Sequence, residues 1–316
     1  MTSTSSRVVT PASVDFLCIG AQRSGTSWLS RNLRAHPGVW VVPCKETHYF
    51  SRSPRYHSPS HLACRNWREK LLGTSQEART WRWMFRVTAR RLLANAPPGE
   101  KLRRLRWIAT YFFGTVNDEW YCSLFREGAG RIRGELTPDY ALLESDDVAR
   151  VAALLPDVKL IALLRDPVDR VLSQLRYHMD GRAEPDLGRA SARELVEFAN
   201  AEGQILRGDY PRMLGIWGSV FSASRIHLAY YDDVCSRPDE VLDGILRFLG
   251  VDPVQHRATE PAAFRVNSAS SRDLSSETVA RVAAAHAGVV QDCADHLGGH
   301  AVEWFENCKR RIDAAR

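Results

Sequence analysis

The chain has 316 residues, of which 44% are apolar and 25% charged, and its formal net charge is +6. This mix is ordinary for a folded globular protein and excludes a mainly disordered, collagen-like or coiled-coil chain. No run approaches the roughly 20 apolar residues that a membrane-spanning helix needs. The Ser/Thr-rich start at 1–10 also lacks the apolar segment of a secretory signal. We therefore expect a cytoplasmic protein without a membrane span.

The seven cysteines give an odd number, and no CxxC pair or Cys/His finger spacing occurs among them. A disulfide framework and a structural zinc site are therefore not expected. We interpret the cysteines as reduced thiols, most of them buried or without a role in chemistry.

Short apolar runs predict strands, and segments with helical spacing lie between them. In chain order the expected strands are 14–20, 39–42, 131–140 (running into a Pro turn), 159–165 and 225–231. The expected helices are 26–35, 146–155, one opened by Pro167, 191–206, 209–221, 238–249, 276–296 and 300–312. Strands that alternate with helices favour an α/β fold with a central, parallel, doubly wound sheet. We expect one domain over residues 1–316.

Residues 51–130 are the least regular part and predict a variable, mainly helical insertion. Within it, 61–110 holds twelve lysines and arginines against three acidic residues, a local balance of +9. The tryptophans interleaved with these charges are Trp67, Trp81, Trp83 and Trp107. The favoured interpretation has arginines facing water and tryptophans facing the core. A platform for an anionic or sugar-like substrate is the second interpretation, and nucleic acid is not expected because no RNA-binding or helix-turn-helix signature occurs.

The strongest motif lies between the first expected strand and the first expected helix, where Gly20 and Gly25 frame a tight loop. Such a loop turns backbone N–H groups toward an anion, and the helix that follows adds its positive N-terminus. A nucleotide-binding P-loop carries a lysine where this chain has Thr26, and the loop's only cation is Arg23. The residues of this loop, one arginine and several hydroxyl groups, are best suited to binding an oxyanion without a metal. The candidate ligands are Gln22, Arg23, Ser24, Gly25, Thr26 and Ser27.

A second motif begins with Arg165, which ends the strand at 159–165, and includes Ser173, two turns into the next helix. A charge at the carboxyl end of a parallel strand lies where such folds bind ligands. A guanidinium fork with a hydroxyl suits a phosphate monoester.

Together the two motifs resemble those of sulfotransferases that use 3′-phosphoadenosine 5′-phosphosulfate (PAPS). The resemblance covers most of 14–50 and 131–275, including the segments at 208–210 and 230–234. It implies a three-layer, P-loop-like sulfotransferase fold related to nucleotide kinases. It further implies that the first loop cradles the 5′-phosphosulfate, that Arg165 and Ser173 hold the 3′-phosphate, and that PAP is the product. Asn267 and Arg272 lie where the family often closes a loop over the nucleotide.

The segment Lys45–Phe50 resembles the K-E-x-H-[FY]-F element of the carbohydrate-type branch, which includes heparan sulfotransferases. In that branch the glutamate is the proposed general base, which makes Glu46 the candidate here and His48 its rival. If 45–50 is extended, side chains 46 and 48 point to the same face. Lys45 is expected near the transferred group. Tyr140, in a segment that resembles E-x-[ST]-P-x-Y, is expected near the acceptor.

Many family members carry lysine where this chain has Arg23. Arginine stabilises charge on the leaving oxygen but is a poor proton donor, because its pKa exceeds about 12. We therefore expect catalysis by charge and positioning, with no metal.

Two other classes of function stay open. A nucleotide kinase-like P-loop phosphotransferase would need a lysine at Thr26 and an aspartate ending a strand. A non-catalytic module that binds an anionic polymer would rest on 61–110 alone. For a sulfotransferase, the expected acceptor is a hydroxyl on a glycan or secondary metabolite. Five lysines against 38 arginines hint at a GC-rich bacterial genome.

Overall fold

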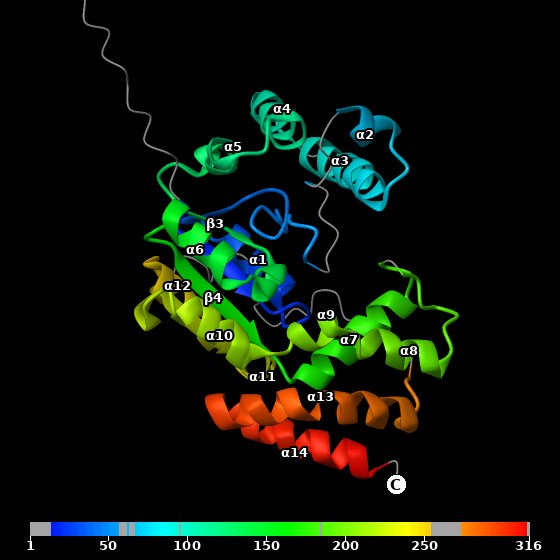
Figure 1. The fold of residues 1–316 in the computed structure, drawn as a ribbon. Coiled ribbons are helices and arrows are strands. Elements are labelled where there is room, and N and C mark those ends of the chain that lie inside the picture. Colours follow the sequence, from blue (N-terminus) through cyan, green and yellow to red (C-terminus); the bar gives the residue numbers. More distant parts are fainter. Residues whose placement is uncertain are drawn as a thin grey trace, which may run out of the picture.

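The computed structural model describes residues 14–56, 62, 67–94, 96–183, 185–253 and 273–314. Within these residues, five strands form one parallel sheet in the order β2-β3-β1-β4-β5 (Figure 1). They are β1 (Phe16–Gly20), β2 (Val39–Val41), β3 (Ile132–Leu136), β4 (Lys159–Leu164) and β5 (Ile226–Tyr230). Each falls within a predicted strand, so the expected parallel α/β sheet is confirmed.

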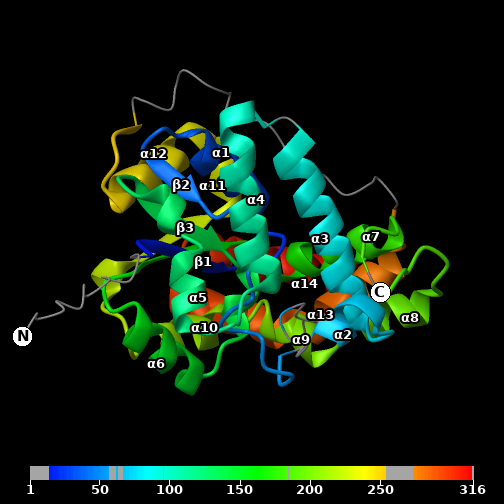
Figure 2. The same ribbon diagram turned by 90° about the horizontal axis from the view of Figure 1, so that it is seen from above.

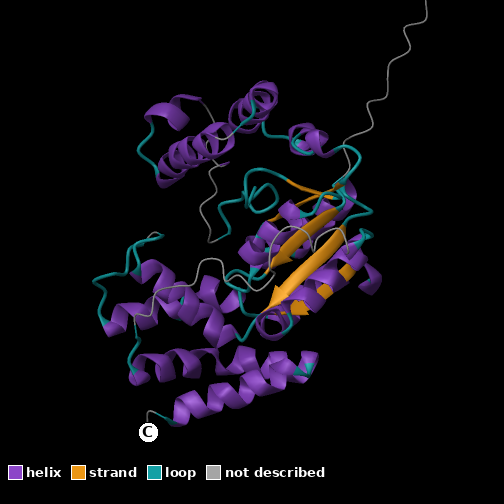
Figure 3. Ribbon diagram, turned by 180° about the vertical axis from the view of Figure 1, so that it is seen from behind, coloured by secondary structure: helices purple, strands orange, loops and turns teal. Residues whose placement is uncertain are grey.

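Both faces of the central part of the sheet are buried, which explains why β1, β2 and β4 are nearly continuous apolar runs. Phe16 and Cys18 of β1 belong to one core cluster, whereas Leu17 and Ile19 belong to the other. The first cluster also contains apolar residues of α1 (Thr26–Ala35) and α12 (Pro238–Leu249). The second is shared with the helices on the opposite face: α6 (Ser145–Leu154), α7 (Pro167–Met179), α10 (Tyr210–Gly218) and α13 (Ser276–Leu297). Helices on both sides of the sheet make three layers (Figure 3).

Local capping chemistry sets several helix boundaries. Asp166 caps α7, since its side chain accepts from the backbone N–H groups of Val168 and Asp169, and Pro167 occupies the first turn. The prediction of one helix over 191–206 is wrong. The backbone is extended at Ala201, so the segment forms two helices, α8 (Ala192–Ala199) and α9 (Glu202–Leu206). The helix predicted over 209–221 is shorter, and α11 (Tyr231–Ser236), which was not predicted, follows β5 directly.

At the C-terminal end α14 (His300–Asp313) packs on α13, on the far side of the molecule from the insertion (Figure 1). The short 3₁₀ turns are η2 (Arg126–Gly128), η3 (Pro138–Leu142) and η4 (Ala223–Arg225). None of the described helices has the length and apolar character that crossing a bilayer requires. Six described cysteines carry free thiols, and all except Cys235 are buried.

The described residues of the insertion form four α-helices that lie together over one end of the sheet (Figures 1 and 2). They are α2 (Trp67–Leu72), α3 (Gln76–Ala94), α4 (Pro98–Phe113) and α5 (Asp118–Ser123), so the expected helical insertion is confirmed. Trp81 and Trp107 are buried as expected. Trp67 and Trp83 are 62% and 59% exposed, so the expectation that all four tryptophans face the core is wrong.

Candidate active site

The first loop leaves the carboxyl end of β1 and opens α1. Gly25 has φ +93° and lies at the N-cap without any side-chain cap, and the first turn of α1 holds no acidic residue. The first N–H groups of such a helix have no partner within the helix, so they can bind an anion. A Cβ at Gly25 would lie 3.1 Å from the Tyr231 ring, so both the backbone conformation and the close contact favour glycine.

The structure brings the residues of the two predicted anion motifs together. Arg23 Nε donates to Ser173 Oγ at 3.1 Å, and Arg165 Nη1 donates to the carbonyl of Arg23 at 3.0 Å. Burial lowers the pKa of the Arg23 guanidinium, and the neighbouring charge of Arg165 adds to this effect. Two arginines and a hydroxyl therefore converge where β1 and β4 end, a suitable arrangement for a multiply charged anion.

Aromatic rings hold both arginines in place. The Arg23 guanidinium lies 4.7 Å from the centre of the Tyr177 ring, and that of Arg165 lies 4.5 Å from the centre of the Tyr231 ring. Tyr210 donates to the carbonyl of Arg165 at 2.7 Å. Sequence reasoning noted the segments that contain Tyr210 and Tyr231 but assigned these side chains no role, because nothing local predicts which arginine a ring will stack against.

The buried amide oxygen of the loop, Gln22 Oε1, lacks a hydrogen-bond partner among the described residues. Ser24 is fully buried, and its hydroxyl lies near the hydroxyl of Tyr210. Buried polar atoms are usually hydrogen-bonded, so an unsatisfied atom beside an uncapped helix N-terminus indicates a polar ligand. The hydroxyl of Ser24 can donate to an oxyanion, as can the guanidinium groups of Arg23 and Arg165. The residues present therefore fit a phosphate- or sulfate-bearing nucleotide.

A second segment, which follows β2, contributes Lys45 and Glu46. Lys45 Nζ lies 2.9 Å from Ser27 Oγ of the first loop and 3.1 Å from Glu46 Oε1. One ammonium group thus joins the anion loop to the candidate base. The Glu46 side chain is 39% exposed, so its carboxylate is open to a second substrate.

The 45–50 segment is not extended, so the condition under which side chains 46 and 48 would share one face is not met. Glu46 and His48 have φ values of +63° and +56°, in the left-handed region. Glu46 N donates to the carbonyl of Leu136, and Thr47 N donates to Thr137 Oγ1 at 3.0 Å, so β3 and its following turn hold this conformation. The two candidate bases nevertheless approach each other, with 4.0 Å between Glu46 Oε2 and His48 Nε2.

Behind Glu46 lies a chain of polar groups that sequence reasoning missed. His48 Nδ1 lies 3.2 Å from Ser51 Oγ and 3.7 Å from Asp139 Oδ2. Asp139 in turn accepts from Arg207 Nε at 3.1 Å, and both of these side chains are buried. His48 thus lies between an exposed carboxylate and a buried ion pair.

Tyr140 lies elsewhere than expected. Its side chain is fully buried, and its hydroxyl donates to Glu135 Oε1 at 2.9 Å. Glu135, also fully buried, accepts from Tyr121 at 2.6 Å, Thr47 at 2.5 Å and Thr137 at 2.8 Å. Tyr140 therefore supports the Lys45–His48 turn from below, and the proposed contact between Tyr140 and the acceptor is withdrawn.

Two predicted nucleotide contacts, Asn267 and Arg272, lie outside the described residues. Among the described residues, no three His, Cys, Asp or Glu side chains gather into a candidate metal site. Metal-free transfer stays a prediction.

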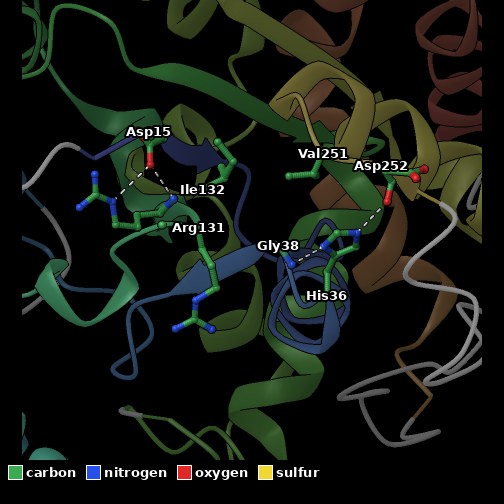
Figure 4. Close-up of a pocket in the computed structure, with 9 residues that line it drawn as sticks. Asp15, His36, Gly38, Arg131, Ile132, Val251 and Asp252 are labelled. Atoms are coloured by element: carbon green, nitrogen blue, oxygen red, sulfur yellow. Dashed lines mark hydrogen bonds and ion pairs between the residues drawn. The ribbon is translucent and has the colours of Figure 1, made fainter.

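A cavity of about 520 Å³ lies at the opposite end of the sheet (Figure 4). Asp15, Gly38 and Arg131, which precede β1, β2 and β3, line it. Asp15 accepts from the backbone N–H of Arg133 at 2.7 Å, and Gly38 N donates to the His36 ring at 3.0 Å (Figure 4). These polar groups fix the starts of the strands. Parallel α/β sheets bind ligands at their carboxyl ends, so this cavity is not the candidate site.

The fold and the paired anion motifs define an α/β protein with an anion-binding loop at the carboxyl end of its parallel sheet, and comparison with known proteins specifies the family. The model described as "Sulfotransferase family" matches residues 15–255. This match covers most of the chain, which therefore belongs to the sulfotransferase family. The expected membership of the sulfotransferase family is therefore confirmed.

Two mouse proteins are similar in sequence. Bifunctional heparan sulfate N-deacetylase/N-sulfotransferase 4 is 23% identical over 233 residues, covering 68% of this chain and 25% of that protein. Bifunctional heparan sulfate N-deacetylase/N-sulfotransferase 1 is 24% identical over 229 residues, covering 67% and 25%. The chain therefore spans only a quarter of the length of these curated relatives.

Two solved structures share the fold. The sulfotransferase from Alicyclobacillus acidocaldarius has a TM-score of 0.59 at 19% identity, with 94% of this chain and 99% of that chain covered. The sulfotransferase domain of the Synechococcus PCC 7002 olefin synthase has a TM-score of 0.50 at 19% identity, with 89% and 97% covered. The predicted three-layer, P-loop-like sulfotransferase fold is confirmed.

Proposed function

We propose that the chain transfers a sulfuryl group from PAPS to an acceptor hydroxyl, with Glu46 as the general base. The observation that carries this proposal is the position of Lys45, whose Nζ contacts Ser27 Oγ at 2.9 Å and Glu46 Oε1 at 3.1 Å. The loop that binds the sulfuryl donor and the carboxylate that activates the acceptor must lie close together, because the two substrates have to be in contact for transfer.

The donor side is assigned from the anion ligands. The N-terminus of α1, with Ser24, Thr26 and Ser27, faces the 5′-phosphosulfate, and Arg23 lies beside the bridging oxygen. Arg165 and Ser173 hold the 3′-phosphate. Bound PAPS supplies the activated sulfuryl group. Gln22 adds an amide at the edge of the loop, where its oxygen has no partner among the described residues.

During transfer the acceptor oxygen forms a bond to sulfur while the bond from sulfur to the 5′-phosphate oxygen breaks. The hydroxyl proton passes to Glu46, and the electron pair of the broken bond leaves with PAP. Arg23 and Lys45 stabilise the charge that develops on the oxygens, which is the main catalytic contribution in reactions with loose transition states. A general base typically adds about 10²- to 10⁴-fold.

His48 is a positioning residue in this proposal. It lies 4.0 Å from Glu46 and 3.7 Å from Asp139, so it can orient the base and relay its proton toward the Asp139–Arg207 pair. The acceptor is a glycan or secondary-metabolite hydroxyl. The exposed carboxylate supports attack by an external hydroxyl.

The test compares the wild-type chain with Glu46→Gln, measuring PAP release from PAPS with a panel of glycan and phenolic hydroxyl acceptors. The variant keeps the size of the side chain and loses the base, so turnover should fall by about 10²- to 10⁴-fold. Binding of PAP, measured by calorimetry, should change little, because the proposal gives Glu46 no contact with the nucleotide.

A matched control is Glu144→Gln, which removes an exposed carboxylate that pairs with Arg212 at 2.5 Å outside the site. This control should keep full turnover. Near-normal turnover in Glu46→Gln would exclude Glu46 as the base and favour His48.

A further inference from the structure

Exposed large apolar side chains are concentrated on three helices of the insertion. Among the described residues, eight of the ten such side chains belong to α2, α3 and α4, and the other two are Val220 and Val302. The eight are Trp67, Leu71, Leu72, Trp83, Val87, Leu102, Leu105 and Phe113. We call these residues, with the basic residues between them, the outer face. An exposed apolar cluster of this kind marks an interaction site.

The outer face is also strongly basic. Residues 67–113 hold eleven lysines and arginines against three acidic residues. Five exposed basic side chains form no hydrogen bond or ion pair with another described residue: Arg79, Arg86, Arg90, Lys101 and Arg106. Their charge is therefore available to an external partner.

The exposed residues of α3 lie on the side of the helix away from the core. On α3, Trp81 and Thr88 are buried, whereas Trp83 and Arg90 lie on the opposite, exposed side. On α4 the buried side includes Phe112, whose ring centre lies 5.6 Å from that of Trp81. The two helices lie side by side over the body of the protein (Figure 2), so their exposed sides form one surface.

We propose that the outer face docks on an anionic lipid bilayer surface. Tryptophan, leucine and phenylalanine enter the boundary between headgroups and acyl chains, and lysine and arginine attract anionic headgroups. A soluble polyanion would use the arginines but leave the apolar side chains in water. Aromatic residues and arginine are also enriched in protein–protein interfaces, so a second copy of the chain is an alternative that the experiment distinguishes.

The insertion that carries the outer face also contacts the acceptor segment. Arg91 of α3 donates a hydrogen bond to the carbonyl of Pro43, which lies two residues before Lys45. The insertion is thus tied directly to the segment that carries Glu46. The docking proposal itself does not depend on sulfuryl transfer and is tested without it.

The experiment measures co-sedimentation of the full chain with vesicles of phosphatidylcholine containing phosphatidylglycerol, and with phosphatidylcholine alone. We expect binding to the anionic vesicles that weakens as salt screens the charges. The triple variant Arg79→Gln/Arg86→Gln/Arg90→Gln should bind about 100-fold more weakly, since each basic residue near an anionic surface contributes about fivefold. The double variant Trp83→Gln/Leu105→Gln should lose about tenfold or more.

The matched control is Val220→Gln/Val302→Gln, which removes the two exposed apolar side chains outside the insertion and should bind vesicles like the wild-type chain. Circular dichroism verifies that every variant is folded. The proposal is overturned if the folded wild-type chain does not bind anionic vesicles, or if the outer-face variants bind them unchanged. Heparin binding that depends on the arginines, without vesicle binding, would identify a soluble polyanion instead. A dimer that only the outer-face variants abolish would identify a second copy of the chain.

Discussion

Replacing Arg165 by alanine tests the assignment of the 3′-phosphate site. Arg165 ends β4, stacks on Tyr231 at 4.5 Å and donates to the carbonyl of Arg23 at 3.0 Å. A hydrogen bond to a charged group contributes about 1.5–3 kcal/mol. Arg165→Ala should therefore weaken PAP binding by about 10- to 150-fold. AMP lacks the 3′-phosphate and should lose less than about fivefold, through the weakened support of Arg23.

Calorimetry with PAP and with AMP is carried out on the wild-type chain and on Arg165→Ala. The loss of PAP affinity is then compared with the loss of AMP affinity, because general damage to the site would weaken both nucleotides alike. Arg193→Ala is the matched control, since it removes an arginine that is paired with Glu197 at the surface and should leave both affinities unchanged. Equal losses of PAP and AMP binding in Arg165→Ala would refute the assigned role.

Three further predictions concern the loop, the buried carboxylate and pH. Gly25→Ala should weaken PAP binding about tenfold by calorimetry, since alanine at φ +93° costs about 1–2 kcal/mol and meets the Tyr231 ring; unchanged affinity would contradict this. Glu135→Gln should lower the free energy of unfolding by about 2–4 kcal/mol in urea, because a buried charged acceptor is lost; an unchanged midpoint would contradict its supporting role. Burial lowers the pKa of His286 to about 4, so its neutral form stabilises the fold above pH 6.5 and that contribution, about 3 kcal/mol, is lost as pH falls through 4. His286→Leu should flatten the dependence of unfolding free energy on pH in that window, and an unaltered dependence would exclude this origin.

The sheet could be predicted because burial on both faces makes β1, β2 and β4 short apolar runs between polar or turn residues. The phosphate loop could be predicted because its glycines and the following helix are adjacent in sequence. The division of 191–206 could not, since every residue there tolerates a helix and the extended turn at Ala201 depends on tertiary packing. The cytoplasmic location and the single domain stay predictions.

The sequence predicted which residues belong to the candidate site better than it predicted their conformations and contacts. Left-handed conformations at Glu46 and His48 have no local signal, since few residues other than glycine adopt them. The Asp139–Arg207 pair joins positions 68 residues apart, so it depends on tertiary packing that no local pattern predicts. Tyr140 lies in a recognisable motif, but the 3₁₀ turn η3 places its ring in the core.

The central claim is that the paired anion motifs bind a 3′-phosphorylated nucleotide without a metal. The most direct measurement is calorimetry of the purified chain with PAP and with ATP–Mg²⁺ in parallel. The account predicts PAP binding at about micromolar affinity or tighter, with no binding of ATP–Mg²⁺. Binding of ATP–Mg²⁺ with none of PAP would contradict it.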